Sequence, residues 1–154
     1  MKNLKQAQRA LFWFGLFKIP IIRFVRPKVV KIDAGQCVIR IPYRRRNKNH
    51  LGGIYIAAFT IGADLAAGFL AFYLFRRQKL RVSLAFKSME AQYHKRAEAD
   101  LFFICKSGKE IAEMIEESKT TGERQNKVLP IYAQLASSDE PIASINIELS
   151  IKVK

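Results

Sequence analysis

The sequence has only two cysteines and lacks the short motifs that mark common enzyme sites. Cys37 and Cys105 stand in segments that alternate like strands, so we expect two buried free thiols and no disulfide. No glycine-rich phosphate loop, no Cys or His metal spacing and no Ser nucleophile elbow occurs. We therefore predict no metal site and no resident cofactor.

Acidic residues are scarce in the first third of the chain. Residues 1–48 carry thirteen Lys or Arg side chains against the single acid Asp33, whereas the rest carries fourteen basic against twelve acidic side chains. This distribution accounts for most of the net charge of +14. Such a field attracts phosphates of a nucleotide-bearing ligand, an anionic lipid surface or nucleic acid, although it also serves solubility alone.

Long tracts rich in Pro, Gly or Ser are also missing, which argues against linkers and disorder. The chain has 154 residues, of which 49% are hydrophobic and 26% charged. This size and composition predict one globular domain over residues 1–154. The low cysteine content favours the reduced cytoplasm.

One apolar run, from Leu51 to Phe75, is long enough to cross a bilayer. Asp64 lies in its middle, where a lone carboxylate is costly in lipid, and basic residues flank both ends. The segments that follow alternate like strands and need a helix to cover their apolar face. We therefore predict a buried helix over roughly Gly53–Phe75, with a membrane span as the alternative.

The remaining segments predict an antiparallel sheet around that helix. Residues 1–26 form an amphipathic, aromatic helix that Pro20 closes or kinks; it packs on the sheet, lines a lipophilic pocket or, less favoured, lies on a membrane. Alternating residues predict the strands, and Gly122 is a stop for a polar helix. The predicted strands are 28–32, 36–43, 82–87, 97–105, 127–137 and 144–153, with the polar helix over 109–122. The fold class is α+β.

Asp64 is the candidate catalytic residue, because it is an acid in an otherwise uncharged stretch of helix. A solvent-facing Asp is the simpler alternative, and helical periodicity cannot decide between them since almost every neighbour is apolar. His50 and His94 are isolated, so we expect a surface or capping role for them and not metal ligation.

The segment Asn49-His50-Leu51-Gly52-Gly53-Ile54-Tyr55, followed by Asp64, resembles the entry to the central helix of hot-dog thioesterases of the phenylacetate-pathway (PaaI-like) type. Asn49, Gly52 and Asp64 fall at matching positions. Tyr55 stands where that family has His, and Ile56 and Ala57 stand where it has two glycines. The order of strands and helices matches too, with an extra short helix before the fifth strand. The resemblance implies a hot-dog fold.

The resemblance also implies an acyl-coenzyme A thioesterase whose site lies between the protomers of a homodimer, or of a tetramer. Asp64 would act as general base or nucleophile. Backbone N–H groups near Tyr55 and Ile56 would polarise the thioester carbonyl, and Asn49 would orient water or substrate. Coenzyme A would enter only as part of the substrate. The implied substrate-binding residues are Gly52, Gly53, Ile56, Arg44, Arg45, Arg46, Arg76 and Arg77, with the arginines holding phosphates or forming a solvated face.

Two other functions remain open from the sequence. A non-catalytic acyl-chain or lipid binder would keep the aromatic N-terminal helix and the pocket without needing Asp64. A nucleic-acid binder would use the basic N-terminal third, but the aromatics there follow helical spacing and make poor base-stacking platforms, so we expect no nucleic-acid partner.

Overall fold

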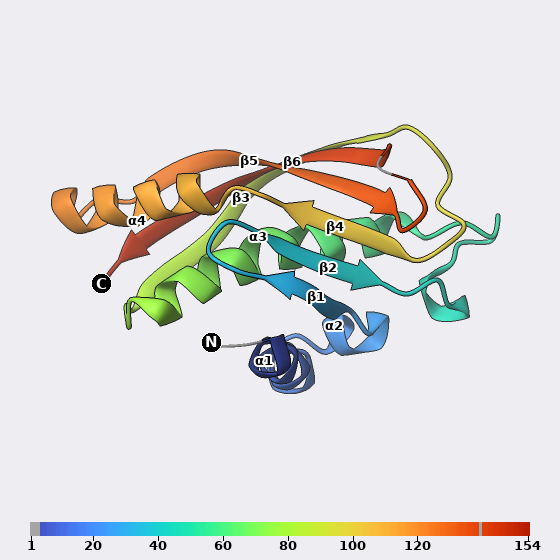
Figure 1. Cartoon of the computed structure of the whole chain (residues 1–154), viewed down its shortest axis with the longest axis horizontal. Coiled ribbons are helices and arrows are strands. Elements are labelled where there is room, and N and C mark those ends of the chain that lie inside the picture. The colour runs from blue at the N-terminus through green and yellow to red at the C-terminus, as the bar shows by residue number, and fades with distance from the viewer. Residues whose placement is uncertain (1–3, 139) are drawn as a thin grey trace.

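The computed structural model describes residues 4–138 and 140–154, and its centre is one long helix, α3 (Ile56–Arg77). The helix is apolar almost all round, and most of its side chains are buried. Figure 1 shows the helix running along the sheet. It is the one helix of the described part of the chain that is long and apolar enough to cross a bilayer. Because strands cover it on several sides, it is a core helix here, as predicted.

Helix α3 begins three residues later than the predicted Gly53. The chain before it turns at Gly52, whose φ of 86° favours glycine, and Lys48 and Ile54 then form an isolated antiparallel bridge. Tyr55 is the extended N-cap residue. The helix ends at Arg77, two residues beyond the predicted Phe75.

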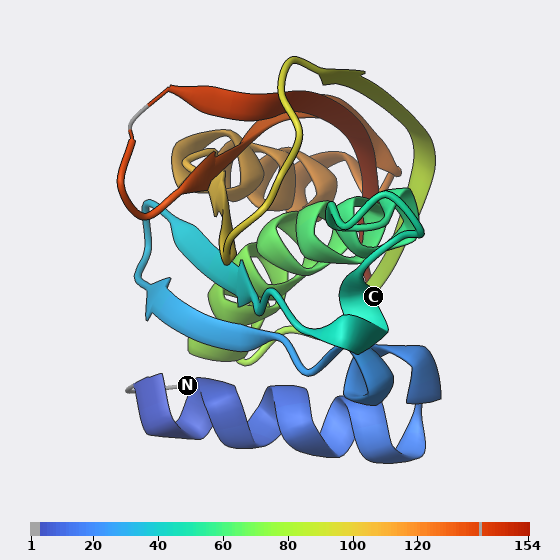
Figure 2. The same cartoon turned by 90° about the vertical axis from the view of Figure 1, so that its right-hand side faces the viewer.

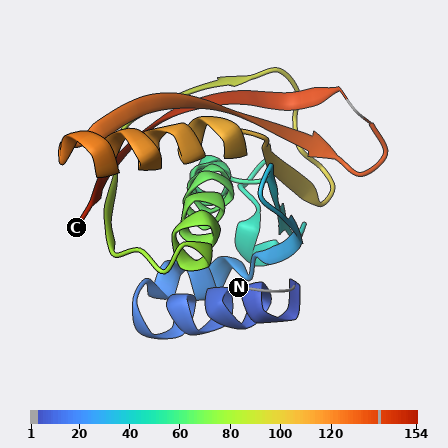
Figure 3. The same cartoon turned by 60° about the vertical axis from the view of Figure 1, so that its left-hand side comes forward.

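The six strands found among the described residues form one antiparallel sheet in the order β1-β2-β4-β5-β6-β3. The sheet curves around α3 (Figures 2 and 3). Strand β3 continues six residues beyond the predicted end at 87, and β6 begins three residues before the predicted 144, because the two strands pair from Val82 and Val153 to Tyr93 and Ala143. Strand β4 instead begins at Leu101, four residues later than the predicted 97. The strand bounds are β1 (Lys28–Ile32), β2 (Cys37–Ile41), β3 (Val82–Tyr93), β4 (Leu101–Cys105), β5 (Gln125–Leu135) and β6 (Pro141–Val153).

The predicted N-terminal helix is two helices, α1 (Leu4–Phe17) and α2 (Pro20–Val25). Residues 1–3 of the prediction lie outside the described residues. Pro20 starts the second helix, because its fixed φ suits a first turn, and Arg26 ends it in the left-handed conformation. Helix α1 lies beside edge strand β1, and the Gln8 side-chain oxygen accepts a hydrogen bond of 2.8 Å from the Val29 N–H. The helix therefore covers that edge of the sheet.

The prediction for the short polar helix and for the two thiols is confirmed. Helix α4 (Gly108–Thr121) ends at Gly122, which has a φ of 71°. Cys37 and Cys105 are buried free thiols that lie opposite each other in the register of β2 and β4. A short 3-10 helix, η1 (Arg45–Asn47), connects β2 to the approach to α3.

Candidate active site

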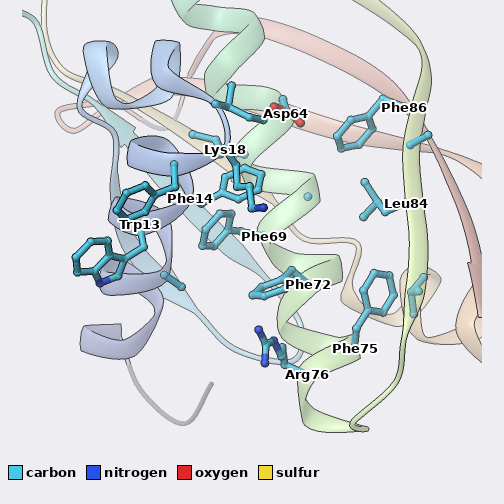
Figure 4. A pocket seen from close by; sticks show the side chains of 17 residues that line it. Trp13, Phe14, Lys18, Asp64, Phe69, Phe72, Phe75, Arg76, Leu84 and Phe86 are labelled. Carbon is cyan, nitrogen blue, oxygen red and sulfur yellow. The ribbon is translucent and has the colours of Figure 1, made fainter.

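Asp64 lies in the middle of α3, on the border of two cavities. The larger, of about 800 Å³, lies between α1, α3 and β3 (Figure 4). The smaller, of about 340 Å³, lies between α3 and the middle of β3. The Asp64 carboxylate is therefore half-buried and accessible from two sides, which corrects the simpler alternative of an Asp on the outer surface of the protein.

The walls of the larger cavity are mainly aromatic. Figure 4 shows Asp64 and Arg76 toward opposite ends of it, with the aromatic rings between them. Twelve residues of α-helix separate these two positions, which corresponds to about 18 Å along the axis. This length and polarity suit an extended aliphatic or aromatic chain. The aromatic side chains of the wall are Trp13, Phe14, Phe17, Phe69, Phe72, Phe75 and Phe86.

Burial raises the pKa of Asp64 from its ordinary value of 3.8 to about 6. Within the part of the chain that the structure describes, no hydrogen bond or ion pair to its carboxylate is found. Lys18 and Arg76 line the larger cavity and Lys87 lines the smaller one. A carboxylate with this pKa ionises within the physiological range and is free to accept a proton from a ligand.

Sequence reasoning missed the polar groups of the smaller cavity. Thr60, Lys87 and Ser88 line it together with Asp64. Thr60 precedes Asp64 by four residues, and residues at this spacing share one face of a helix. Since the two are the only hydroxyl and acid in the first half of α3, their spacing was a signal in the sequence. The presence of Lys87 and Ser88 of β3 in this cavity could not be predicted from the sequence, because it depends on how the sheet curves.

The residues predicted at the helix start lie around a third cavity, of about 190 Å³. Asn49, Gly53 and Ile56 line it, but Asp64 does not. The Asn49 side-chain oxygen accepts hydrogen bonds from the N–H groups of Leu51 (3.0 Å) and Gly53 (3.1 Å). Asn49 thus holds the turn that leads into α3.

One detail of the predicted carbonyl-binding site is corrected. The Tyr55 N–H donates to the Asn47 carbonyl oxygen at 2.8 Å, so it cannot polarise a thioester carbonyl. Among the first N–H groups of α3, that of Ala58 donates to the Tyr55 carbonyl oxygen at 2.9 Å. Within the described residues, the N–H groups of Ile56 and Ala57 have no earlier turn to bond and remain the available donors. Gly52 lies in the turn before them, where its carbonyl oxygen accepts a hydrogen bond of 2.7 Å from the Tyr43 hydroxyl.

The predicted arginines fall into two groups. Arg76 lines the larger cavity and its guanidinium lies 5.0 Å from the centre of the Phe72 ring, while Arg77 lies over Tyr73. Arg44, Arg45 and Arg46 instead surround a separate hollow beside Phe24, which does not include Asp64. A role in holding coenzyme A phosphates stays a prediction for both groups.

A long apolar helix wrapped by a curved antiparallel sheet in this strand order is the hot-dog fold, as predicted. The chain belongs to the family described as a domain of unknown function, DUF4442, whose model matches residues 7–151. The comparison with curated proteins finds no match to this sequence.

Solved structures share the fold over almost the whole chain. A Pseudomonas aeruginosa protein, PA5026, described as a "probable thioesterase", is 18% identical, with a TM-score of 0.81 over 99% of this chain and 97% of its own. A Chlorobaculum tepidum protein of unknown function is 14% identical, with a TM-score of 0.81 over 99% and 98%. The Haemophilus influenzae thioesterase HI1161 is 8% identical, with a TM-score of 0.71 over 99% and 92%. These similarities establish the fold.

Proposed function

We propose that this protein is an acyl-coenzyme A thioesterase that uses Asp64 to hydrolyse the thioester. The observation that carries the proposal is the position of Asp64, a half-buried carboxylate with a pKa raised to about 6 at the end of a long aromatic cavity. The acyl chain would occupy the larger cavity, and the thioester would lie at Asp64. The description of related folds as thioesterases supports the same reaction class.

The ionised carboxylate supports two forms of the reaction. As a general base, Asp64 takes a proton from water while the water oxygen bonds to the thioester carbon. The carbon–sulfur bond then breaks, and coenzyme A leaves as the thiol with that proton. As a nucleophile, Asp64 itself bonds to the carbon, the carbon–sulfur bond breaks, and coenzyme A leaves as a thiolate that takes a proton from water. Water then hydrolyses the mixed anhydride, which releases the free acid and restores the Asp64 carboxylate. N–H groups at the start of a helix would stabilise the oxyanion in either case.

A homodimer would bring such a helix start to Asp64. In a single chain, strand β3 has one edge paired with β6 and the other edge open over twelve residues, and open edges of this length favour pairing. Tyr93 of β3 lines the cavity at the helix start, and Phe86 and Met89 line the cavity at Asp64. Two β3 strands, one from each protomer, could pair in antiparallel register about a two-fold axis between Tyr93 and Met89. This pairing would place the start of α3 of one protomer near Asp64 of the other. A monomeric mass at micromolar concentration contradicts this arrangement.

The test is release of free thiol from acyl-coenzyme A substrates of increasing chain length by wild type and by Asp64→Asn. General acid–base catalysis contributes roughly 10²–10⁴-fold, so we expect a loss of that order. The matched control is Asp33→Asn, which changes an exposed acid in the turn between β1 and β2 and should leave turnover unchanged. In wild type, kcat/KM should rise by up to about fourfold for each added methylene, at about 0.8 kcal/mol, until the chain fills the cavity.

A non-catalytic acyl-chain binder is the second candidate, and one observation favours it. Tyr55, Ile56 and Ala57 replace the His and the two glycines that the resemblance would place at the helix start. Absence of turnover on every substrate, together with equal binding of a fatty acid by wild type and Asp64→Asn, would establish the binder and refute the enzyme.

A further inference from the structure

Helices α1 and α2 carry large apolar side chains on the outside of the molecule. Helix α1 is the outermost layer on its side of the fold in every view (Figures 1–3). These side chains are each between 48% and 69% exposed, and we call them the aromatic face. The aromatic face consists of Phe12, Trp13, Phe17, Ile21 and Phe24.

Packing among the described residues, 4–138 and 140–154, does not account for this face. The inward stripe of α1 is Ala7, Leu11 and Gly15, which are buried. The outward rings contact one another, since Trp13 stacks on Phe17 with ring centres 5.3 Å apart. A surface helix in water normally carries polar residues on its outer side. An apolar outer side on two successive helices indicates a site of interaction.

Basic side chains surround the aromatic face, and residues 4–32 contain no acid. Arg9 precedes Phe12 and Trp13 by three and four residues, so it shares their side of α1. The Arg23 guanidinium lies 5.5 Å from the centre of the Phe12 ring. Phe24 has a similar neighbour, because the Arg46 guanidinium lies 5.5 Å from its ring. Cations therefore lie beside both ends of the face.

We propose that the aromatic face docks the protein on an anionic lipid bilayer. Aromatic rings beside Lys and Arg match the boundary between acyl chains and charged headgroups, where the rings enter the apolar layer and the cations stay with the phosphates. A second copy of this chain is a poorer partner, because a symmetric contact through this face would bring like charges together. A membrane supplies both an apolar layer and the opposite charge.

Two hollows strengthen the fit to a lipid surface. The hollow of about 500 Å³ between Phe24 and Arg44, Arg45 and Arg46 is suited to a phosphate. In this proposal these arginines bind the phosphate of a lipid headgroup, in place of the coenzyme A phosphates that the resemblance implies for them. Trp13 and Phe17 belong both to the aromatic face and to the wall of the 800 Å³ cavity. That cavity therefore borders the docked side. The proposal holds whether or not Asp64 hydrolyses thioesters.

The chain provides its own reporter, because Trp13 is its only tryptophan. The experiment adds vesicles of phosphatidylcholine, alone or with an equal part of phosphatidylglycerol, to the full-length protein. With the anionic vesicles we expect a blue shift of the emission, quenching by lipids brominated on their acyl chains, and co-sedimentation. The zwitterionic vesicles should give a much smaller response, and about 0.5 M salt should weaken the anionic response.

Paired variants distinguish binding through the aromatic face from non-specific adsorption of exposed apolar side chains. Phe17→Ser with Phe24→Ser should abolish co-sedimentation, whereas Val128→Ser with Tyr132→Ser, which removes two exposed side chains of β5, should not. Arg9→Gln with Arg23→Gln should weaken binding by about fivefold for each charge. Circular dichroism confirms that each variant is folded.

Three results overturn the proposal. The first is unchanged Trp13 emission with every vesicle. The second is co-sedimentation without bromolipid quenching, which means that another surface binds. The third is a blue shift that depends on protein concentration without lipid, which means that a second copy covers the face.

Discussion

Each side of α3 carries a glycine, but the two glycines have opposite effects on the space beside the helix. On the side toward β4, Gly62 allows the Phe103 ring to approach so closely that an added Cβ would lie 2.4 Å from it. On the side toward the cavities, an added Cβ at Gly68 would lie 3.5 Å from Phe86 and 3.8 Å from the Asp64 carboxylate, which is ordinary contact. One glycine permits close packing, and the other keeps space open beside an ionisable group.

This difference shows how an almost uniformly apolar helix holds both a core and a site. The packed side is filled to the density of a protein interior, so any added atom must displace another. The cavity side holds Asp64 in a poorly solvated position, which costs stability but tunes its pKa. Substitutions on the two sides should therefore differ in sign as well as in size.

The largest expected effect is the pH dependence of stability that Asp64 causes. Its pKa is raised in the folded state, so between about pH 4 and pH 6 the folded protein binds more protons than the unfolded chain, and stability falls as pH rises. A rise from 3.8 to about 6 corresponds to roughly 3 kcal/mol. Urea unfolding at pH 4 and pH 7.5 should show that wild type loses this amount relative to Asp64→Asn.

Wild type and Asp64→Asn share every other carboxylate, so the difference between their stability curves isolates Asp64. Lys18, Arg76 and Lys87 line its cavities and are the same in both proteins. If the free energy of unfolding changes with pH in the same way in both proteins, Asp64 is well solvated. The proposed difference between the two sides of α3 would then be wrong.

Gly62→Ala should come next in size. The new methyl group would overlap the fully buried Phe103 ring, and overpacking of this kind costs about 1–3 kcal/mol. The melting temperature should fall by roughly 2–4 °C for each kcal/mol lost. Thermal unfolding followed by circular dichroism measures the melting temperature. A value at or above that of wild type would mean that the packed side of α3 accommodates the added methyl group without overlap.

Gly68→Ala should have the smallest effect on stability and the opposite sign. Ala favours a helix over Gly by up to about 1 kcal/mol, and no clash opposes the gain. The methyl group would nevertheless narrow the cavity beside Asp64. We therefore expect a slightly higher melting temperature together with lower thioesterase activity. Activity equal to that of wild type would mean that the substrate does not occupy the part of the cavity beside Gly68.

Much of the fold could be predicted from the sequence because its patterns are local. The alternation in β6 and the apolar length of α3 determined the fold class, and Pro20 correctly marked a break. The start of α3 was placed at Gly53 because small apolar residues continue the helical pattern there. The hydrogen bonds of the Asn49 side chain instead hold this segment in a turn, so the helix begins later.

The site was only partly predictable. Asp64 was found because a single charge in an apolar run is conspicuous. A lipophilic pocket lined by the aromatic N-terminal helix was one of the expectations, and α1 does line the larger cavity. The parts of α3 and β3 that complete its walls could not be predicted, because these elements are far apart in the sequence. Periodicity could not show which side of α3 faces space, since both sides are apolar. The roles of Asn49, Tyr55 and the arginines, the homodimer and the cytoplasmic location stay predictions.

The pH dependence of kcat/KM for a medium-chain acyl-coenzyme A tests the central claim most directly. Measured from about pH 4.5 to about pH 8.5, thiol release by wild type should rise with an apparent pKa near 6, because Asp64 must be ionised to act. Asp64→Asn should lose that rise along with most of the activity. Equal activity of the two proteins across this range would show that the reaction does not use Asp64, and would contradict the account.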